Sequence, residues 1–462
     1  MVKKLYDAAV FHTVCLAVLP CLLLSGCASA DADVEPVFHV SASVSSQPDT
    51  VDEVLVSTAS PEDKTAVSDA SAASPEDTAG SDAAAASQED TAAAPAASAT
   101  SPGDTAVAPD ASAASPEDVT ALQAEPVEDP VLTYDFSLGF AGDINFADDY
   151  IPMGYLAALG SEDIADGIDQ EYIDIMNRMD LMWINNEFTY SERGEPLPGK
   201  AFTFRSSPSH VSYLKDLGVD IVGLANNHSF DYGEVSLLDT LDTLNDAGIP
   251  YVGAGRNIAE ASSPVYLETN GFTIAYVAAS CAEQYIYTPE ATETTPGILL
   301  CVDDTRILES IRTAAENADY VIVLPHWGTE QSTWLQDKQK DSARAYIDAG
   351  ADAVIGAHPH ILQGIEYYNG KPILYSLGNF WFDNYDIDTI VAELHFTGTT
   401  SRDDPSLDDA AIELIVYPGT QTGIHTYIAG NEGWEDRILR YLETISHNEI
   451  RIDENRVVHA AE

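Results

Sequence analysis

Positively charged residues are scarce in this sequence. Twenty Lys and Arg residues stand against 76 Asp and Glu residues, which gives a formal net charge of −56 over 462 residues. A surface with this charge repels nucleic acid and anionic lipid headgroups, so we expect no nucleic-acid partner. An anionic substrate would have to be bound locally, by metal ions or by a few well-placed groups.

Cysteine is also scarce. Cys15, Cys21 and Cys27 lie near the N-terminus, and only Cys281 and Cys301 lie in the part that has the composition of a folded domain. The absence of a C-x-x-C pair argues against a zinc site built from thiolates. If the protein is exported, the two later cysteines could form a disulfide or remain separate buried thiols, because a sequence does not give their distance.

The N-terminal hydrophobic run, residues 14–24, is too short for a typical membrane-spanning helix. It follows Lys3 and Lys4 and ends in Leu24-Ser25-Gly26-Cys27, which resembles a bacterial lipobox. We therefore expect residues 1–27 to be a lipoprotein signal peptide, with Cys27 lipidated. The mature protein would then be extracytoplasmic and anchored to the bacterial cell membrane. An ordinary cleaved signal peptide is the alternative.

Residues 28–130 lack almost all aromatic and basic side chains. Lys64 is the only cation there, and a degenerate Ser-Pro-Glu-Asp unit recurs about every 14 residues. Low hydrophobicity with high net charge cannot offset the entropy lost on ordering the chain. The segment is predicted to be a disordered, acidic Ala/Ser/Pro-rich linker that holds the folded region away from the membrane.

From residue 131 onward, short apolar runs alternate with stretches of helical spacing. The runs that predict strands are 136–141, 181–184, 221–224, 273–278, 320–324 and 353–355. The stretches that predict helices are 211–217, 237–247, 307–315 and 341–349. This alternation predicts an α/β fold with parallel strands. Segments 389–395 and 411–417 favour antiparallel strands, and 434–446 favours a final helix.

Polar side chains follow five of the predicted strands. They are Asp143, Glu187, Asn227 with His228, His326, and His358 with His360. In open α/β sheets the carboxyl ends of strands form the edge at which ligands bind. Carboxylates combined with imidazoles suit Mn, Fe or Zn better than Ca or Mg. The number of ligands exceeds one tetrahedral site, so we expect a binuclear centre in which one carboxylate bridges two divalent ions.

Structural alternatives exist for these residues. A lone histidine at a strand end is commonly exposed or hydrogen-bonded, and Asn227 with His228 could be a helix N-cap and a buried polar residue. The run His358-Pro359-His360 has little structural purpose after a strand, which favours metal binding at that pair.

Five ordered motifs carry a family resemblance. They are Gly142-Asp143, Asn186-Glu187, Ala225-Asn226-Asn227-His228 with Asp231-Tyr232-Gly233, His326-Trp327-Gly328-Thr329-Glu330, and Gly356-Ala357-His358-Pro359-His360 with Tyr375-Ser376-Leu377-Gly378-Asn379-Phe380. The region from about 134 to 417 resembles the CapA family, the poly-γ-glutamate capsule synthesis proteins (PGA_cap). That family is similar to the calcineurin-like metallophosphoesterases. The resemblance implies a four-layer αββα sandwich over residues 131–430, followed by a C-terminal helix and tail at 431–462.

The resemblance also implies roles for individual residues. The metal ligands would be Asp143, Glu187, Asn227, His326, His358 and His360, and His228 would protonate the leaving group or steady it. Two positions depart from the metallophosphoesterase pattern, because Asn145 replaces a histidine and Glu187 an aspartate. The residues expected to orient ligands or contact substrate are Asn145, Asn186, Asp231, Glu330 and Asn379, with Glu366 as a further candidate.

Two functions follow from these observations. The first is a binuclear-metal-dependent hydrolase, similar to phosphoesterases, that acts in capsule, poly-γ-glutamate or cell-wall polymer metabolism. The alternative is a non-catalytic accessory protein, tethered to the membrane, for the assembly, export or anchoring of a capsular polymer.

Overall fold

The computed structural model describes residues 131–282, 287–403, 405–422 and 424–461. The predicted signal peptide, the lipidation site Cys27 and the acidic linker lie outside these ranges. Among the described helices, none has both the length and the apolar content needed to cross a membrane.

Strand β1 (Val131–Ile144) is the centre of the larger sheet, because it pairs with three other strands. It is antiparallel to β16 (Ile387–Ser401), and parallel to β2 (Leu181–Asn186) and β15 (Asn379–Trp381). The other strands are β5 (Ile221–Gly223), β6 (Tyr251–Val252), β17 (Ala411–Thr422), β18 (His425–Ile428), β19 (Ile450–Ile452) and β20 (Val457–Ala460). The sheet has the order β19-β20-β17-β16-β1-β2-β5-β6, with β15 paired to β1 and β18 paired to β17.

The second sheet has six strands, four of them parallel. They are β8 (Val265–Thr269), β9 (Phe272–Ser280), β11 (Tyr320–His326), β12 (Ala353–Ile355), β13 (Ile365–Tyr368) and β14 (Lys371–Leu374). The order is β13-β14-β12-β11-β9-β8, and only the outer strands β13 and β8 run antiparallel to their neighbours. Two short ribbons pair β3 (Thr189–Tyr190) with β4 (Arg205–Ser206), and β7 (Ala254–Gly255) with β10 (Gly297–Ile298).

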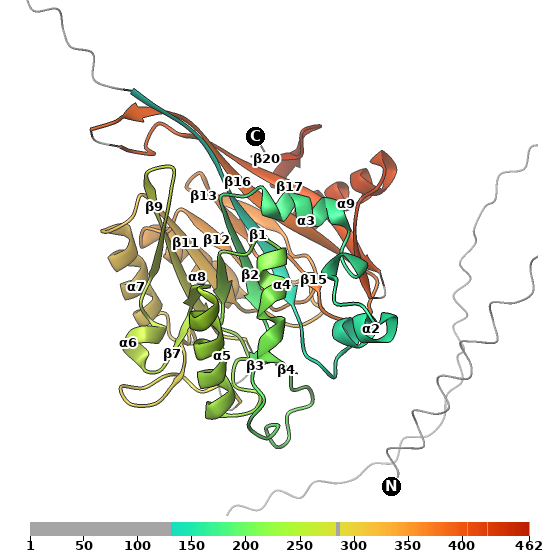
Figure 1. Cartoon of the computed structure of the whole chain (residues 1–462). Helices are drawn as coiled ribbons and strands as arrows, with labels where there is room; N and C mark the ends of the chain where they lie inside the picture. The colour runs from blue at the N-terminus through green and yellow to red at the C-terminus, as the bar shows by residue number, and fades with distance from the viewer. Residues whose placement is uncertain (1–130, 283–286, 404, 423, 462) are drawn as a thin grey trace, which may run out of the picture. The chain divides into compact units, whose positions relative to one another are not determined.

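Helices cover the outer face of each sheet (Figure 1). The α-helices are α2 (Ile151–Leu159), α3 (Gln170–Asn177), α4 (Ser212–Asp216), α5 (Glu234–Ala247), α6 (Ile258–Ala261), α7 (Thr305–Ala315), α8 (Asp337–Asp348) and α9 (Glu432–Ile445). Buried side chains of α3, α4 and α5 pack with β2 and β5 of the larger sheet. Those of α7 and α8 pack with β9, β11 and β12 of the smaller sheet.

Alternation along the strands divides the core into layers. In β9, Ile274 and Tyr276 face the space between the sheets, whereas Ala275 and Val277 face the helices α7 and α8. Large aromatic side chains fill the space between the sheets, and full burial of one such side chain stabilises the fold by roughly 1.5–3 kcal/mol. Two sheets packed face to face with helices outside confirm the predicted four-layer αββα arrangement.

The predicted strands and helices are present, with ends that shift by a few residues. The antiparallel segments predicted at 389–395 and 411–417 are parts of β16 and β17. Helices α2 and α3 were not predicted from the sequence. Residues 431–462 contain the predicted helix, α9, and also β19 and β20, which join the larger sheet through β17.

Candidate metal centre

The carboxyl ends of strands from both sheets bring five of the candidate ligands together. Asp143 lies at the end of β1, Glu187 follows β2, His326 ends β11, and His358 and His360 follow β12. Their potential ligand atoms form two groups, Asp143–Glu187–His326 and Glu187–His358–His360. Within each group these atoms all lie within 4.8 Å of one another, and every side chain is buried. Glu187 belongs to both groups.

The carboxylate of Glu187 has the surroundings expected of a shared ligand. Its Oε1 atom is buried and has no hydrogen-bond partner among the residues that the structure describes. It lies 3.5 Å from Nε2 of His326 and 3.9 Å from Nε2 of His360. Two atoms that bind one metal ion at about 2.1 Å each lie roughly 3–4 Å apart. These distances therefore fit a cation between the carboxylate and the imidazoles better than direct hydrogen bonds.

His358 is buried, and neither of its ring nitrogens has a hydrogen-bond partner among the described residues. Burial lowers the pKa of His358 well below its usual value, so the ring is neutral. A neutral imidazole is the form that binds metal. Because an unpaired buried polar group is costly, the orphaned nitrogens of His358 and the orphaned oxygen of Glu187 fit a divalent cation.

The turn that carries the two histidines has unusual backbone angles. His358 has φ of 100° and His360 has φ of 59°, a left-handed region that few residues other than glycine adopt. The carbonyl of Pro359 between them accepts a 2.9 Å hydrogen bond from the backbone N–H of Gln331. Such strain is concentrated at functional sites, where the surrounding structure holds it in place.

His360 is oriented by two acceptors. Its Nδ1 lies 2.8 Å from Oδ1 of Asn379 and 3.2 Å from Oδ2 of Asp143. Although burial opposes the charged form, the carboxylates of Glu187 and Asp143 raise the pKa of His360 to about 10. The contact with Asn379 agrees with the orienting role predicted for that residue, and it leaves Nε2 of His360 facing Glu187.

Asp143 is held by the close pairing of β1 with β15. Its backbone N–H donates to the carbonyl of Gly378 at 3.1 Å. The preceding residue is Gly142, where an added Cβ would lie 1.8 Å from that same carbonyl oxygen. Burial raises the pKa of Asp143, but the hydrogen bond and charge of His360 outweigh it and lower this pKa below its usual value. The Gly378-Asn379-Phe380 motif thus places both Asp143 and His360.

Asn227 and His326 meet directly. Nε2 of His326 and Oδ1 of Asn227 are 2.7 Å apart, and both side chains are buried. Burial lowers the pKa of His326 to about 3, so this ring is neutral as well. Since both atoms are of ligand type, the pair extends the donor set of the Asp143–Glu187–His326 group.

His228 lies beside the candidate ligands in a buried network with Asp231 and Lys200. Its Nδ1 is 2.7 Å from Oδ2 of Asp231, and its Nε2 is 3.9 Å from Oε1 of Glu187. Lys200 pairs with the other oxygen of Asp231 and donates to the backbone carbonyl of Asn227. Asp231 thus contacts the proposed proton donor and not one of the predicted ligand histidines. Lys200 was missed because it lies in a loop whose sequence shows no periodic pattern.

Asn185 is a second residue that the sequence reasoning missed. Its side-chain amide donates to Asp143 at 2.7 Å and to Glu187 at 3.2 Å, and lies 3.3 Å from Nδ1 of His326. Strand alternation could have identified it, because Asn185 and Glu187 lie two positions apart and face the same side of the sheet. Asn186 instead donates to the carbonyl of Phe188.

Two other predicted residues contact groups outside the candidate ligand set. Asn145 accepts from the N–H of Ala147. Glu366 pairs with Arg344 and accepts a hydrogen bond from Tyr375. Glu330 is exposed, and its negative charge contributes to raising the pKa values of Glu187 and His360, after the larger effects of burial and of nearer groups.

Aromatic rings border the histidines. The ring of Phe204 lies 4.4 Å from that of His228, and the ring of Phe382 lies 4.6 Å from that of His360. The two phenylalanines are 5.5 Å apart and both buried. Exclusion of water by such rings strengthens electrostatic interactions inside a site.

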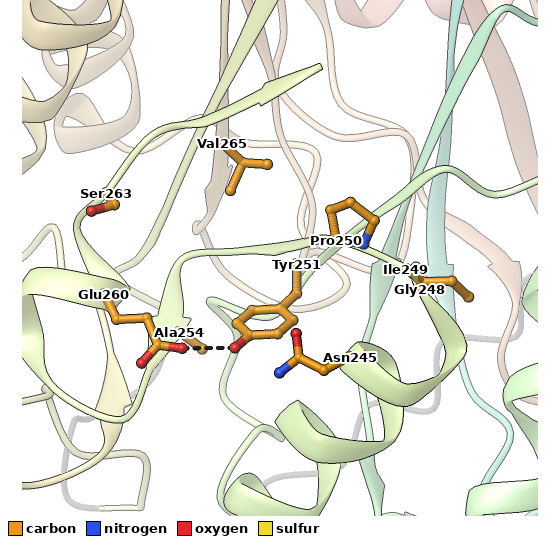
Figure 2. A pocket seen from close by; sticks show the side chains of 9 residues that line it. All are labelled: Asn245, Gly248, Ile249, Pro250, Tyr251, Ala254, Glu260, Ser263 and Val265. Atoms are coloured by element: carbon orange, nitrogen blue, oxygen red, sulfur yellow. Dashed lines mark hydrogen bonds between the residues drawn. The ribbon is translucent and has the colours of Figure 1, made fainter. Parts of the chain in front are cut away.

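One surface hollow of about 480 Å³ is separate from this centre (Figure 2). It lies beside the C-terminal end of α5, and Tyr251 there donates to Glu260 at 2.7 Å. None of its lining residues is a candidate ligand.

Comparison with known proteins reveals extensive sequence similarity. A family model described as "Bacterial capsule synthesis protein PGA_cap" matches residues 137–384. The "PGA biosynthesis protein CapA" of Bacillus subtilis (strain 168) is 36% identical over 251 residues, 54% of this chain and 63% of that protein. The "Capsule biosynthesis protein CapA" of Bacillus anthracis is 38% identical over 177 residues, 37% of this chain and 42% of that protein. The chain thus spans less than two thirds of these relatives' length.

Solved structures are more distant. A putative 5'-nucleotidase from Staphylococcus aureus has 13% sequence identity and a TM-score of 0.38, and the match covers 68% of this chain and 59% of that one. A hypothetical protein from Thermus thermophilus has 19% identity and a TM-score of 0.36, with 61% and 99% covered. At such TM-scores the similarity supports no inference about function.

Proposed function

Since the chain belongs to the bacterial capsule synthesis protein family PGA_cap, we propose that it is a metal-dependent hydrolase, similar to phosphoesterases, that acts on a capsular or cell-wall polymer. The observation that carries this proposal is the membership of Glu187 in two buried groups of ligand atoms, with one oxygen that has no partner in the described part of the chain. A merely structural cluster would have been expected to pair that oxygen.

The two groups would hold two divalent ions, with Glu187 shared between them. Asp143 and His326, extended by Asn227, would complete one site, and His358 with His360 the other. The mixture of carboxylates and imidazoles suits Mn, Fe or Zn. Such ions supply Lewis acidity, which makes water a stronger nucleophile at neutral pH and neutralises an anionic substrate.

His228 is placed to transfer a proton to the leaving oxygen. Because Asp231 accepts a hydrogen bond from its Nδ1, the nitrogen that faces the centre is Nε2. Lys200 balances the charge of Asp231 and fixes its position. A histidine that is held by a carboxylate and aimed at the reacting group is suited to general acid catalysis.

The relatives' names guide the choice of substrate. Two of them are described as proteins of PGA or capsule biosynthesis. Anchoring through Cys27 would place this chain outside the cell membrane, where such polymers are found. The strongly acidic composition disfavours broad contact with a polyanion, so the ions and their surroundings would bind only the bond to be cleaved.

The test is metal analysis of the purified full chain together with hydrolysis of bis-p-nitrophenyl phosphate in added Mn²⁺. We expect bound metal and metal-dependent hydrolysis in the native chain. The variant His228→Ala should keep its metal and lose about 10²-fold or more in rate, because general acid catalysis contributes roughly 10²–10⁴-fold. A chain that binds no metal and hydrolyses nothing would contradict the proposal and favour the accessory role.

A further inference from the structure

Cys281 and Cys301 occupy neighbouring positions on two paired segments. The N–H of Ser280 donates to the carbonyl of Leu299, and the N–H of Cys301 donates to the carbonyl of Ser280, each at 2.9 Å. These bonds form a parallel bridge between Ser280 and Leu300, so that the cysteines are the next residues along each segment. Neighbouring strands lie about 4.8 Å apart, and disulfides join Cα atoms roughly 4.4–6.8 Å apart.

The side chains of the two cysteines lie on the same side of the paired segments. Cys301 is fully buried in the apolar cluster beneath α7 and α8, and Cys281 packs against that cluster while remaining partly exposed. Cys281 is therefore the thiol that an oxidant in solution reaches first.

We propose that Cys281 and Cys301 are a cross-linking site that a small-molecule disulfide, such as oxidised glutathione, converts to an intramolecular disulfide. The Cys281 thiolate attacks one sulfur of the oxidant, which breaks its S–S bond and releases one glutathione thiolate. The Cys301 sulfur then attacks the Cys281 sulfur of the mixed disulfide and releases the second glutathione. The two protons lost by the cysteines are taken up by the two glutathione thiolates, and two electrons pass to the oxidant.

The cross-link would brace the backbone behind the candidate metal centre. The carbonyl of His326 accepts hydrogen bonds from the N–H groups of Cys281 at 3.0 Å and Ala282 at 3.1 Å. Within the closed loop, the hydroxyl of Thr288 donates to the carbonyl of Asn227 at 2.7 Å. The cysteines are 20 positions apart, and closing a loop of that length restricts the unfolded chain. This inference does not depend on the proposed hydrolase activity.

The experiment uses the full chain with Cys15, Cys21 and Cys27 replaced by serine, so that only the two thiols of interest remain. The reduced protein should contain two titratable thiols after denaturation. After refolding in a mixture of reduced and oxidised glutathione it should contain none, and peptide mapping should recover the two cysteines in one cross-linked pair. The melting temperature should rise by roughly 5 °C and fall again after reduction with dithiothreitol.

In the same background, Cys281→Ser and Cys301→Ser serve as matched controls. Each should keep one thiol or take up one glutathione, and neither should gain thermal stability on oxidation. Two thiols that remain after refolding in the redox mixture would overturn the proposal. Cross-links only between chains, or glutathione attached without a cross-link, would overturn it as well.

Discussion

Lys200 and Asp231 form an ion pair inside the protein, with side chains that are only 7% and 0% exposed. Asp231 uses its second oxygen to accept hydrogen bonds from His228 and from the backbone N–H of Phe204. A single carboxylate thus contacts a buried cation, the proposed proton donor and the backbone of the residue before β4. We therefore expect the Lys200–Asp231 ion pair to contribute both to the stability of this region and to the position of His228.

Removal of one partner from this buried pair should be costly. Lys200→Met would leave Asp231 as an uncompensated buried charge, and we expect a loss of about 3–5 kcal/mol in the free energy of unfolding. The control is Lys338→Met, since Lys338 pairs with Asp304 at a site where the side chains are 37% and 19% exposed. That change should cost about 1 kcal/mol or less in urea denaturation. Equal losses for both variants would contradict the assignment.

Substitution of His358 should reduce metal binding and have little effect on the stability of the metal-free protein. His358→Asn removes a candidate ligand whose ring nitrogens have no hydrogen bonds to any described residue, and asparagine tolerates positive φ. We expect elemental analysis to show about half the metal of the native chain. The unfolding free energy of the metal-free form should change by no more than about 1 kcal/mol. His210→Asn, outside the site, should keep the native metal content.

Glu187 should affect both ions, because its carboxylate belongs to both ligand groups. Glu187→Gln keeps the shape of the side chain but removes the negative charge that a bridging ligand needs. Elemental analysis should therefore find less metal than in His358→Asn, and close to none. Glu366→Gln is the matched control, since Glu366 pairs with Arg344 away from the ligands. If Glu187→Gln retained as much metal as the His358 variant, a shared ligand would be the wrong interpretation.

Metal binding should release protons. The carboxylates around His360 raise its pKa to about 10, against 6.5 ordinarily, so at pH 7 the metal-free ring carries a proton. A ligand imidazole must lose that proton. Affinity should therefore weaken as the pH falls from 10, by up to about tenfold per pH unit for one displaced proton.

Titration of the metal-free chain with Mn²⁺ in weakly buffered indicator solution measures this release. We expect about one proton or more per chain at pH 7, and a smaller release from His360→Asn. Affinity that did not change between pH 6 and pH 8 would contradict the displacement of a proton from His360.

Substitution by alanine should have opposite effects on the stability of the protein at Gly142 and at Gly154. A Cβ at Gly142 would lie 1.8 Å from the carbonyl oxygen of Gly378, so Gly142→Ala must separate β1 from β15. We expect a loss of about 3 kcal/mol or more in unfolding free energy. Gly154 lies within helix α2, and apart from the local helix backbone no atom of the described ranges lies within 4 Å of an added Cβ. Gly154→Ala should stabilise the protein by roughly 0.5–1 kcal/mol, and a loss there as large as at Gly142 would contradict the packing argument.

The fold class and most candidate ligands could be predicted from the sequence, because the signals are local. Apolar runs alternate with helical stretches, and Asp143, His326 and His358 each stand at or just after the end of such a run. The ordered motifs also predicted the family, which the match over residues 137–384 confirms.

Tertiary structure decided which of these residues share a site, since the two sheets must pack before their strand ends can meet. It brought Asn185 and Lys200 to the ligands, and it directed Glu366 to Arg344 instead. It also placed Cys281 beside Cys301. The spacing of the two cysteines along the chain does not give their separation in the fold. Local pattern specifies the elements and their ends, whereas contacts between loops depend on how those elements pack in space.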